Sequence, residues 1–233
     1  SSAYAKICVL LLLLLCCVTL PAALDLRLSN DFRVYFSADN PELSAYEAFE
    51  EDFTSHDSLV LMLVLPESED EDTWFKTDYG PLLYEIELAL WTAPAVHRVN
   101  ALTNYQYTQV DDNNLTVTPV IELIHKIVDQ PAQLQALFAS DPQLDKVYLS
   151  PDYRVIVFQA DLYLDSDTPD QAREIYRYTD ALRTNWQAQY PQVDFYLIGS
   201  VTSNVTLEDA VMNDLLLLVP VTYLVLIMGL LFF

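Results

Sequence analysis

The sequence predicts a mixed α+β domain of the split βαβ type, placed between two apolar segments. Three observations predict this arrangement. Residues 7–24 and 215–233 contain no charged residue and no histidine. Between them, short β-type runs alternate with helical periods in the order strand, helix, paired strands, helix, strand. Turn-forming residues, prolines among them, separate these runs and give the predicted elements their ends.

The two apolar segments are long enough to cross a membrane. At about 1.5 Å of rise per residue, helices of 18 and 19 residues match a hydrocarbon core of roughly 30 Å. We therefore expect a transmembrane helix within residues 1–24 and a second, truncated one within 214–233. The second segment stops inside its span, so we expect the chain to be the N-terminal portion of a longer protein.

Three alternatives for these segments stay open. Either segment could instead be a buried helix of a soluble domain, although each is unusually long and uniform for that. The first could be a cleaved signal peptide, with cleavage near Pro21-Ala22-Ala23, which would leave one anchor. A lipoprotein signal ending at Cys16 is disfavoured, because Leu15 stands where such signals need a small residue.

The region between the segments, residues 25–213, is strongly acidic. Together with Asp214 it holds all 34 acidic residues, and ten of the 11 basic ones, so residues 25–214 carry a formal net charge of −24. Lys6 precedes the first segment, which places the N-terminus in the cytoplasm and the acidic domain outside it. Such a surface repels nucleic acid, which is therefore not an expected partner. Cys8, Cys16 and Cys17 all lie in the first segment, so the domain has no disulfide framework.

The first half of the domain begins with an extended entry at residues 26–40. A helix over 41–53 follows, capped by Ser37 or Asn40. Residues 58–65 form a continuous apolar run, which indicates a strand buried on both faces. The acidic run 67–72 is expected to be a solvated loop rather than a calcium loop, since it lacks alternating ligands and a glycine turn.

A second helix is predicted over residues 78–94. Asp78 is its expected cap, Pro81 lies in its first turn and Pro94 ends it. Its apolar face towards the core comprises Leu82, Leu83, Ile86 and Leu90. Two extended segments, 97–109 and 114–120, then form a hairpin-like pair, with Asp111, Asp112 and Asn113 between them.

The second half of the domain is predicted in the same way. Residues 122–139 are helical and broken at Pro131. Strands over 146–150 and 154–164 are joined by a turn at residues 150–153. The helix over 168–190 has Thr168 as its cap and Pro169 at its first position. Its core stripe comprises Ala172, Ile175, Tyr176, Thr179, Leu182 and Trp186. A short strand over 195–198 ends at Gly199, and residues 200–213 lead into the second apolar segment.

This order of strands and helices is that of a ferredoxin-like α+β sandwich with additional elements.

The sequence lacks the motifs of several kinds of chemistry. With glycine only at positions 80, 199 and 229, the chain has no phosphate-binding loop, dinucleotide fingerprint or nucleophile elbow. His56, His97 and His125 have no ligand-like spacing. We therefore assign no catalytic, cofactor-binding or metal-binding residue and expect no enzyme activity, and the substrate-binding residues stay unassigned. Asn114-Leu115-Thr116 and Asn204-Val205-Thr206 fit the short glycosylation pattern.

Five stretches resemble one protein family in the same order along the chain. The most specific are NDFRVYFSADNPEL at residues 30–43 and AYEAFE at 45–50. RVNALTNYQ at 98–106, SPD at 150–152 and LIG at 197–199 follow. Together they resemble the first periplasmic loop of RND-superfamily exporters, of the MMPL-like branch. The acidic run 67–72 departs from the family pattern and leaves the loop there uncertain.

The resemblance implies the N-terminal part of a proton-driven, multi-pass exporter of lipids or other hydrophobic molecules in the bacterial inner membrane. The parts would be the first span, a periplasmic porter domain at residues 25–213 and the start of the second span. Apolar residues within 59–65 and 155–164 are candidates to line a substrate route, with plain core as the alternative. Neither apolar segment, 7–24 or 215–233, contains an acid or a histidine, so the proton-coupling acids would lie in later helices.

The resemblance also sets the expected partners. They are membrane lipids, a lipid-like substrate, the remaining transmembrane helices of the same protein and, as an open alternative, further copies of the chain. The rival reading is a membrane-anchored extracytoplasmic sensor or ligand-binding module, in which the acidic domain binds the ligand. A membrane-tethered hydrolase is a more distant alternative, since the chain has no nucleophile motif.

Overall fold

The computed structural model describes residues 35–37, 39–52, 57–65, 74, 79–111, 114–127, 130–141, 144–164, 168 and 170–232. The acidic region forms one compact unit, Phe36–Thr206, and Leu207–Phe233 belong to a second. The first apolar segment, residues 26–34 of the predicted extended entry 26–40, the acidic run 67–72 and His56 lie outside the described residues. The predictions made for them are therefore left as predictions.

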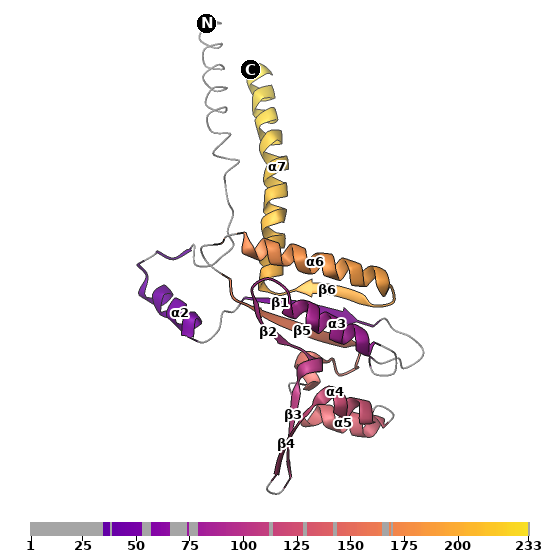
Figure 1. The fold of residues 1–233 in the computed structure, drawn as a ribbon. Coiled ribbons are helices and arrows are strands. Elements are labelled where there is room, and N and C mark those ends of the chain that lie inside the picture. Colours follow the sequence, from indigo (N-terminus) through magenta and orange to yellow (C-terminus); the bar gives the residue numbers. More distant parts are fainter. Residues whose placement is uncertain are drawn as a thin grey trace. The chain divides into compact units, whose positions relative to one another are not determined.

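The centre of the acidic unit is a four-stranded sheet in which every pairing is antiparallel (Figure 1). Its strands are β1 (Ser58–Val64), β2 (Val96–Asn100), β5 (Val155–Leu162) and β6 (Asp194–Ile198), in the spatial order β2-β5-β1-β6. Helix α3 (Gly80–Trp91) connects β1 to β2, and α6 (Gln171–Gln189) connects β5 to β6. The predicted α+β class is confirmed at this level: a mixed domain built on an antiparallel sheet.

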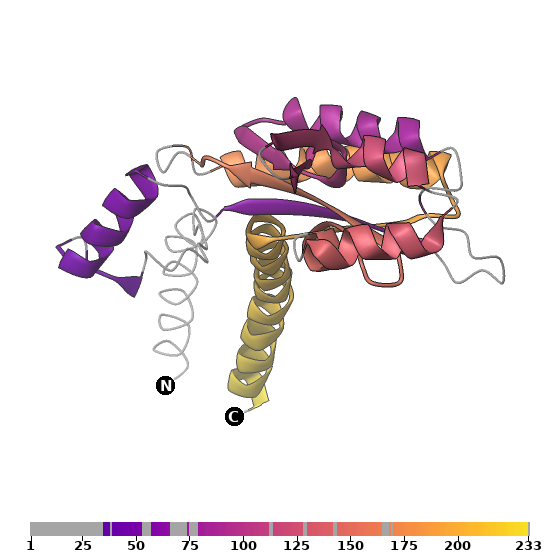
Figure 2. The same ribbon diagram turned by 90° about the horizontal axis from the view of Figure 1, so that it is seen from below.

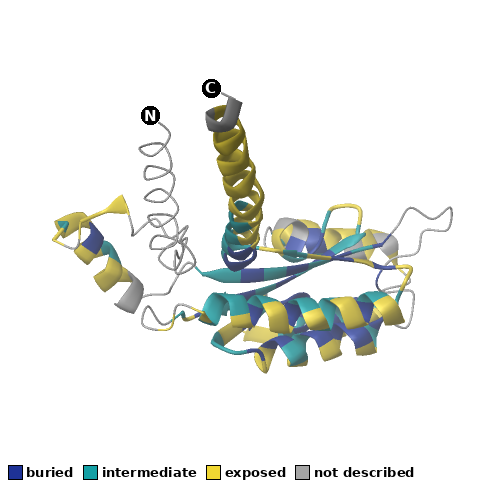
Figure 3. Ribbon diagram, turned by 90° about the horizontal axis from the view of Figure 1, so that it is seen from above, coloured by how far each residue is buried: buried dark blue, intermediate teal, exposed yellow. Residues whose placement is uncertain are grey.

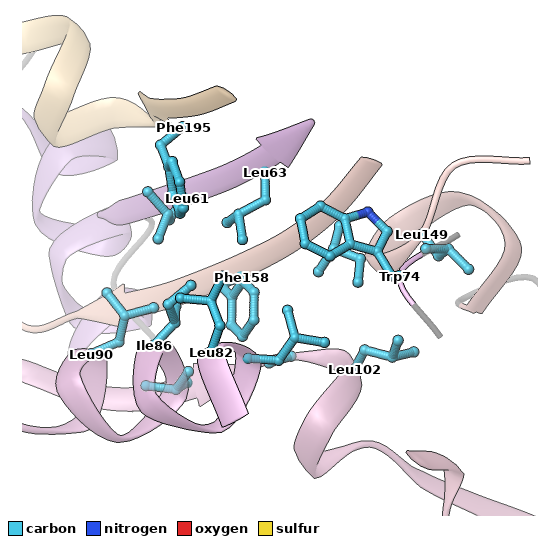
Figure 4. Packing of buried hydrophobic residues seen from close by; sticks show 14 of the residues in the cluster. Leu61, Leu63, Trp74, Leu82, Ile86, Leu90, Leu102, Leu149, Phe158 and Phe195 are labelled. Carbon is cyan, nitrogen blue, oxygen red and sulfur yellow. The ribbon is translucent and has the colours of Figure 1, made fainter. Parts of the chain in front are cut away.

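Helices α3 and α6 lie side by side on one face of this sheet (Figure 2). The hydrogen bond from Trp186 in α6 to Glu85 in α3 joins them. Both predicted core faces are confirmed. Leu82, Leu83, Ile86 and Leu90 of α3 are buried, and the α6 stripe is buried or packed against the core. Figure 4 shows the α3 side chains directed at Leu61 and Phe158 of the central strands.

The segment between β2 and β5 is an insertion. Its elements are η2 (Leu102–Asn104), β3 (Gln106–Asp111), β4 (Asn114–Pro119), α4 (Val120–Ile127), α5 (Pro131–Ser140) and η3 (Leu144–Tyr148). Strands β3 and β4 pair with each other as a separate hairpin that extends from the four-stranded sheet (Figure 1). The predicted hairpin and the helix break at Pro131 are confirmed. Two hydroxyl contacts join the start of the hairpin to the end of α5. Tyr105, just before β3, donates to Oδ2 of Asp141, just after α5, over 2.6 Å, and the Tyr107 hydroxyl of β3 lies 2.7 Å from Ser140 Oγ.

Four local predictions need correction. Residues 97–109 are not one strand, because η2 separates β2 in the main sheet from β3 in the hairpin. Residues 146–148 belong to the π-helical turn η3, and only Leu149 pairs with β5, through a single bridge to Ile156. The N-cap of α3 is Tyr79, while Asp78 lies outside the described residues. The N-cap of α6 is Asp170 rather than Thr168.

The start of one helix follows its prediction closely. Helix α2 spans Pro41–Asp52, and its cap is Asn40, one of the two predicted candidates. The side-chain Oδ1 of Asn40 accepts hydrogen bonds from the backbone N–H groups of Glu42, at 2.8 Å, and Leu43, at 3.2 Å. It thereby satisfies two of the donors that a helix start leaves without an intrahelical partner.

Helix α7 (Ser200–Phe232) begins directly after β6 and continues through the second apolar segment. Among the described residues it is the one helix long and apolar enough to cross a membrane. Its residues from Leu215 to Met228 are exposed (Figure 3).

Candidate functional site

The four-stranded sheet has two different faces. Directly opposed residues share a face, and the register pairs Leu61 with Phe158 and Met62 with Val157. Leu59, Leu61, Leu63, Ile156, Phe158, Ala160 and Leu162 are fully buried and form the face that meets α3 and α6. The intervening residues of β1 and β5 are half-buried, so burial alternates strictly along both strands (Figure 3). The prediction that residues 58–65 are buried on both faces is therefore wrong.

We call the opposite side of the sheet the second face. Its apolar part is formed by Val60, Met62, Val64, Val155, Val157, Tyr196 and Ile198. Tyr196 and Ile198, on the edge strand β6, are 49% and 45% exposed. The five residues on β1 and β5 are half-buried. Partly accessible apolar side chains on three neighbouring strands make this face a candidate binding surface.

The same face becomes polar towards β2. Arg98 and Asn100 of β2 stand opposite Asp161 and Gln159 of β5. The carboxylate of Asp161 accepts a hydrogen bond at each oxygen, from Asn100 Nδ2 and from Gln159 Nε2, both over 2.8 Å. These four side chains form what we call the polar end of the second face.

Tyr148 interacts electrostatically with two residues of the polar end. Burial raises the pKa of the Tyr148 hydroxyl, the positive charge of Arg98 lowers it, and the carboxylate of Asp161 raises it again. Arg98 and Asp161 thus both act on Tyr148, which keeps its proton at neutral pH. An apolar surface that ends in hydrogen-bonding groups suits a molecule with an apolar body and a polar head.

The two substrate-route candidates from the sequence, residues 59–65 and 155–164, have the same outcome. Within 59–65 and 155–164, the fully buried residues are plain core, which was the stated alternative. Only the alternate residues, such as Met62 and Val157, lie on the second face. Sequence reasoning missed Tyr196 and Ile198. The alternation in β6, where buried Phe195 lies between exposed Asp194 and Tyr196, is the signal that could have identified them.

The remaining chemistry-bearing residues do not assemble. His97 and His125 are exposed, on β2 and α4 respectively. In the part of the chain that the structure describes, no group of three or more histidine, cysteine, aspartate or glutamate residues is placed to hold a metal ion. The second face, with its polar end, is therefore the candidate site.

In comparisons with known proteins, no family model matches the chain and no curated protein matches it.

Proposed function

We propose that this chain is the N-terminal part of a proton-driven RND/MMPL-like membrane exporter, and that the second face receives its lipid-like substrate. The observation that carries the proposal is the composition of that face. Seven apolar residues on three strands adjoin a polar end held by hydrogen bonds. A lipid offers the same two parts, an acyl body and a polar head, so the surface and the substrate class are complementary.

The strand order supports the porter-domain part of the proposal. The segments β1-α3-β2 and β5-α6-β6 interleave, because β5 lies between β1 and β2 while β6 lies on the far side of β1. This is the arrangement expected of a ferredoxin-like split βαβ domain. The segment inserted between β2 and β5 is an addition to that pattern, and the sequence had predicted additional elements.

Helix α7 supports the membrane part. It carries the apolar segment without a break from Ser200, directly after β6, so the last strand of the domain leads straight into a candidate span. That segment contains no acid after Asp214. Proton coupling would then depend on acidic residues in other membrane helices of the same protein, as the family resemblance implies.

The coding sequence downstream of Phe233 provides the test. The proposal predicts several closely spaced apolar spans, at least one with an aspartate or glutamate inside the span. A membrane-anchored sensor would instead continue into a soluble signalling domain, such as a kinase-like or cyclase-like one. That result would contradict the exporter proposal while leaving the second face as a ligand-binding surface.

A further inference from the structure

Helix α3 carries a stripe of large apolar side chains on its outer side. Tyr84, Leu88 and Trp91 have the spacing i, i+4, i+7, which places them on one face of the helix. They are 47%, 67% and 43% exposed. We call these three residues the α3 stripe. Tyr178 of α6 adjoins its C-terminal end, where its hydroxyl lies 3.4 Å from Thr92 Oγ1.

This stripe is unusual because the inner face of the same helix is also apolar. Leu82, Leu83, Ile86 and Leu90 already fill the core, so α3 is hydrophobic on both sides. A surface helix normally turns charged residues towards water, and a helix that is apolar all round is normally covered. Apart from two glutamates, α3 is apolar on both sides, so its outer side is a candidate surface for another molecule.

The charges that α3 itself places beside the stripe are negative. The only charged residues of α3 are Glu85 and Glu87, and the helix has no lysine or arginine. Glu85 accepts a hydrogen bond from Trp186 Nε1, and Glu87 accepts one from Asn104 Nδ2. Both carboxylates thus stay at the flanks of the stripe. The charges of Glu87 and Glu122 also reach Tyr84, since they add to burial in raising the pKa of its hydroxyl.

These negative charges discriminate between the possible binding partners of the stripe. A second copy of the chain would carry the same glutamates and the same net charge of −23, so the two copies would repel each other. Anionic lipid headgroups are repelled for the same reason. A basic partner gains from the same field, and its apolar side chains can bury a tyrosine, a leucine and a tryptophan. Tyrosine and tryptophan are the residue types that most often dominate binding energy at interfaces.

We propose that the α3 stripe is the docking surface for an amphipathic helix of another protein, whose apolar face is flanked by lysine or arginine. The mode is that of a helix laid along an apolar surface, with anchors at helical spacing. The surface lies on the opposite side of the sheet from the second face. The inference therefore does not depend on what the second face binds.

The test uses the full chain in detergent micelles and a synthetic amphipathic helix of leucine and lysine as the probe. Trp74 and Trp186 are buried and Trp91 is exposed, so a blue shift of tryptophan fluorescence on binding reports on the stripe. Leu88→Ser is the test variant. Leu115→Ser, at an equally exposed leucine (67%) on the β3–β4 hairpin, is the matched control.

We expect Leu88→Ser to weaken binding of the leucine–lysine helix about tenfold or more, and Leu115→Ser to leave it unchanged. A leucine–glutamate helix of the same pattern should bind at least tenfold more weakly than the lysine form. Equal effects of the two variants, equal binding of the two helices, or no binding would overturn the proposal. So would a dimer in sedimentation velocity that Leu88→Ser dissolves, because the cover would then be a second copy.

Discussion

The indole Nε1 of Trp186, in α6, donates a hydrogen bond to Oε1 of Glu85, in α3, over 2.9 Å. The two residues are 101 positions apart in the sequence. The Trp186 ring is buried and stacks on Phe195 of β6, with ring centroids 6.4 Å apart. One side chain therefore connects both helices of the covered face to the edge strand of the sheet.

Removing the acceptor should destabilise the domain. Glu85→Ala leaves the indole N–H without its partner, and we expect the free energy of unfolding to fall by about 1–3 kcal/mol. Glu85→Gln keeps an oxygen acceptor and should lose clearly less. Denaturant unfolding of the two variants in detergent provides the measurement. Equal stability of the alanine and glutamine variants would show that this hydrogen bond is not what Glu85 contributes.

Gly199 ends β6 in a backbone conformation that side chains rarely adopt, with φ at +111°. A Cβ atom there would lie 2.5 Å from the carbonyl oxygen of Ser58. We expect Gly199→Ala to lower the thermal midpoint sharply, because strain alone costs on the order of 1–3 kcal/mol and the overlap adds to it. Gly80→Ala, where nothing lies within 4 Å, is the control and should be neutral or slightly stabilising. Similar losses in both variants would contradict the geometry at Gly199.

The two sheet faces predict opposite sensitivities for neighbouring residues of β5. Phe158 is fully buried against α3, so Phe158→Ala should cost about 3–5 kcal/mol. Val157 is half-buried on the second face, and Val157→Ala should cost about 1 kcal/mol. Chemical unfolding of both variants checks the assignment of faces. A loss at Val157 as large as that at Phe158 would mean that the second face is core.

The turn before β5 should give the domain a measurable dependence on acid. A hydrogen bond from the Ser150 hydroxyl lowers the pKa of the Asp152 carboxyl, burial opposes the shift, and the backbone N–H of Arg154 adds to it. Because the folded-state pKa is depressed, the stabilisation is present above the ordinary value of about 3.9. It is lost as the pH falls through the lower folded-state value.

Asp152→Asn removes the titrating group. Its stability should therefore fall less than that of the unchanged chain between about pH 6 and pH 3. Unfolding midpoints recorded at several pH values supply the comparison, and Ser150→Ala, which removes the hydroxyl donor, should behave in between. Parallel curves for the unchanged chain and Asp152→Asn would show that the carboxyl contributes nothing specific.

Local signals in the sequence predicted most of the elements. Prolines and apolar periods defined the core faces of α3 and α6, because those faces depend only on helical spacing and burial. The cap at Asn40 followed from its side chain. The sequence of β1 misled because an uninterrupted apolar run is typical of a strand covered on both sides, whereas here the alternate residues form the second face.

The remainder depended on contacts between distant segments. Nothing local in residues 97–109 shows that η2 diverts the chain from the main sheet into a separate hairpin. The polar end of the second face brings Asn100 and Asp161 together from strands that are 61 positions apart. Only the register of β2 on β5 assembles it. The stripe on α3 was present in the sequence, but its exposure required the position of the helix on the sheet.

Site-specific crosslinking in membranes tests the central claim most directly. Photoreactive p-benzoylphenylalanine replaces Tyr196 on the second face or, as the control, Tyr84 on α3, two tyrosines of nearly equal exposure at 49% and 47%. After illumination in native membranes, mass spectrometry should find a lipid adduct at position 196 and none at position 84. No lipid adduct at position 196, or equal lipid adducts at both, would contradict the assignment of the second face as a lipid-binding surface.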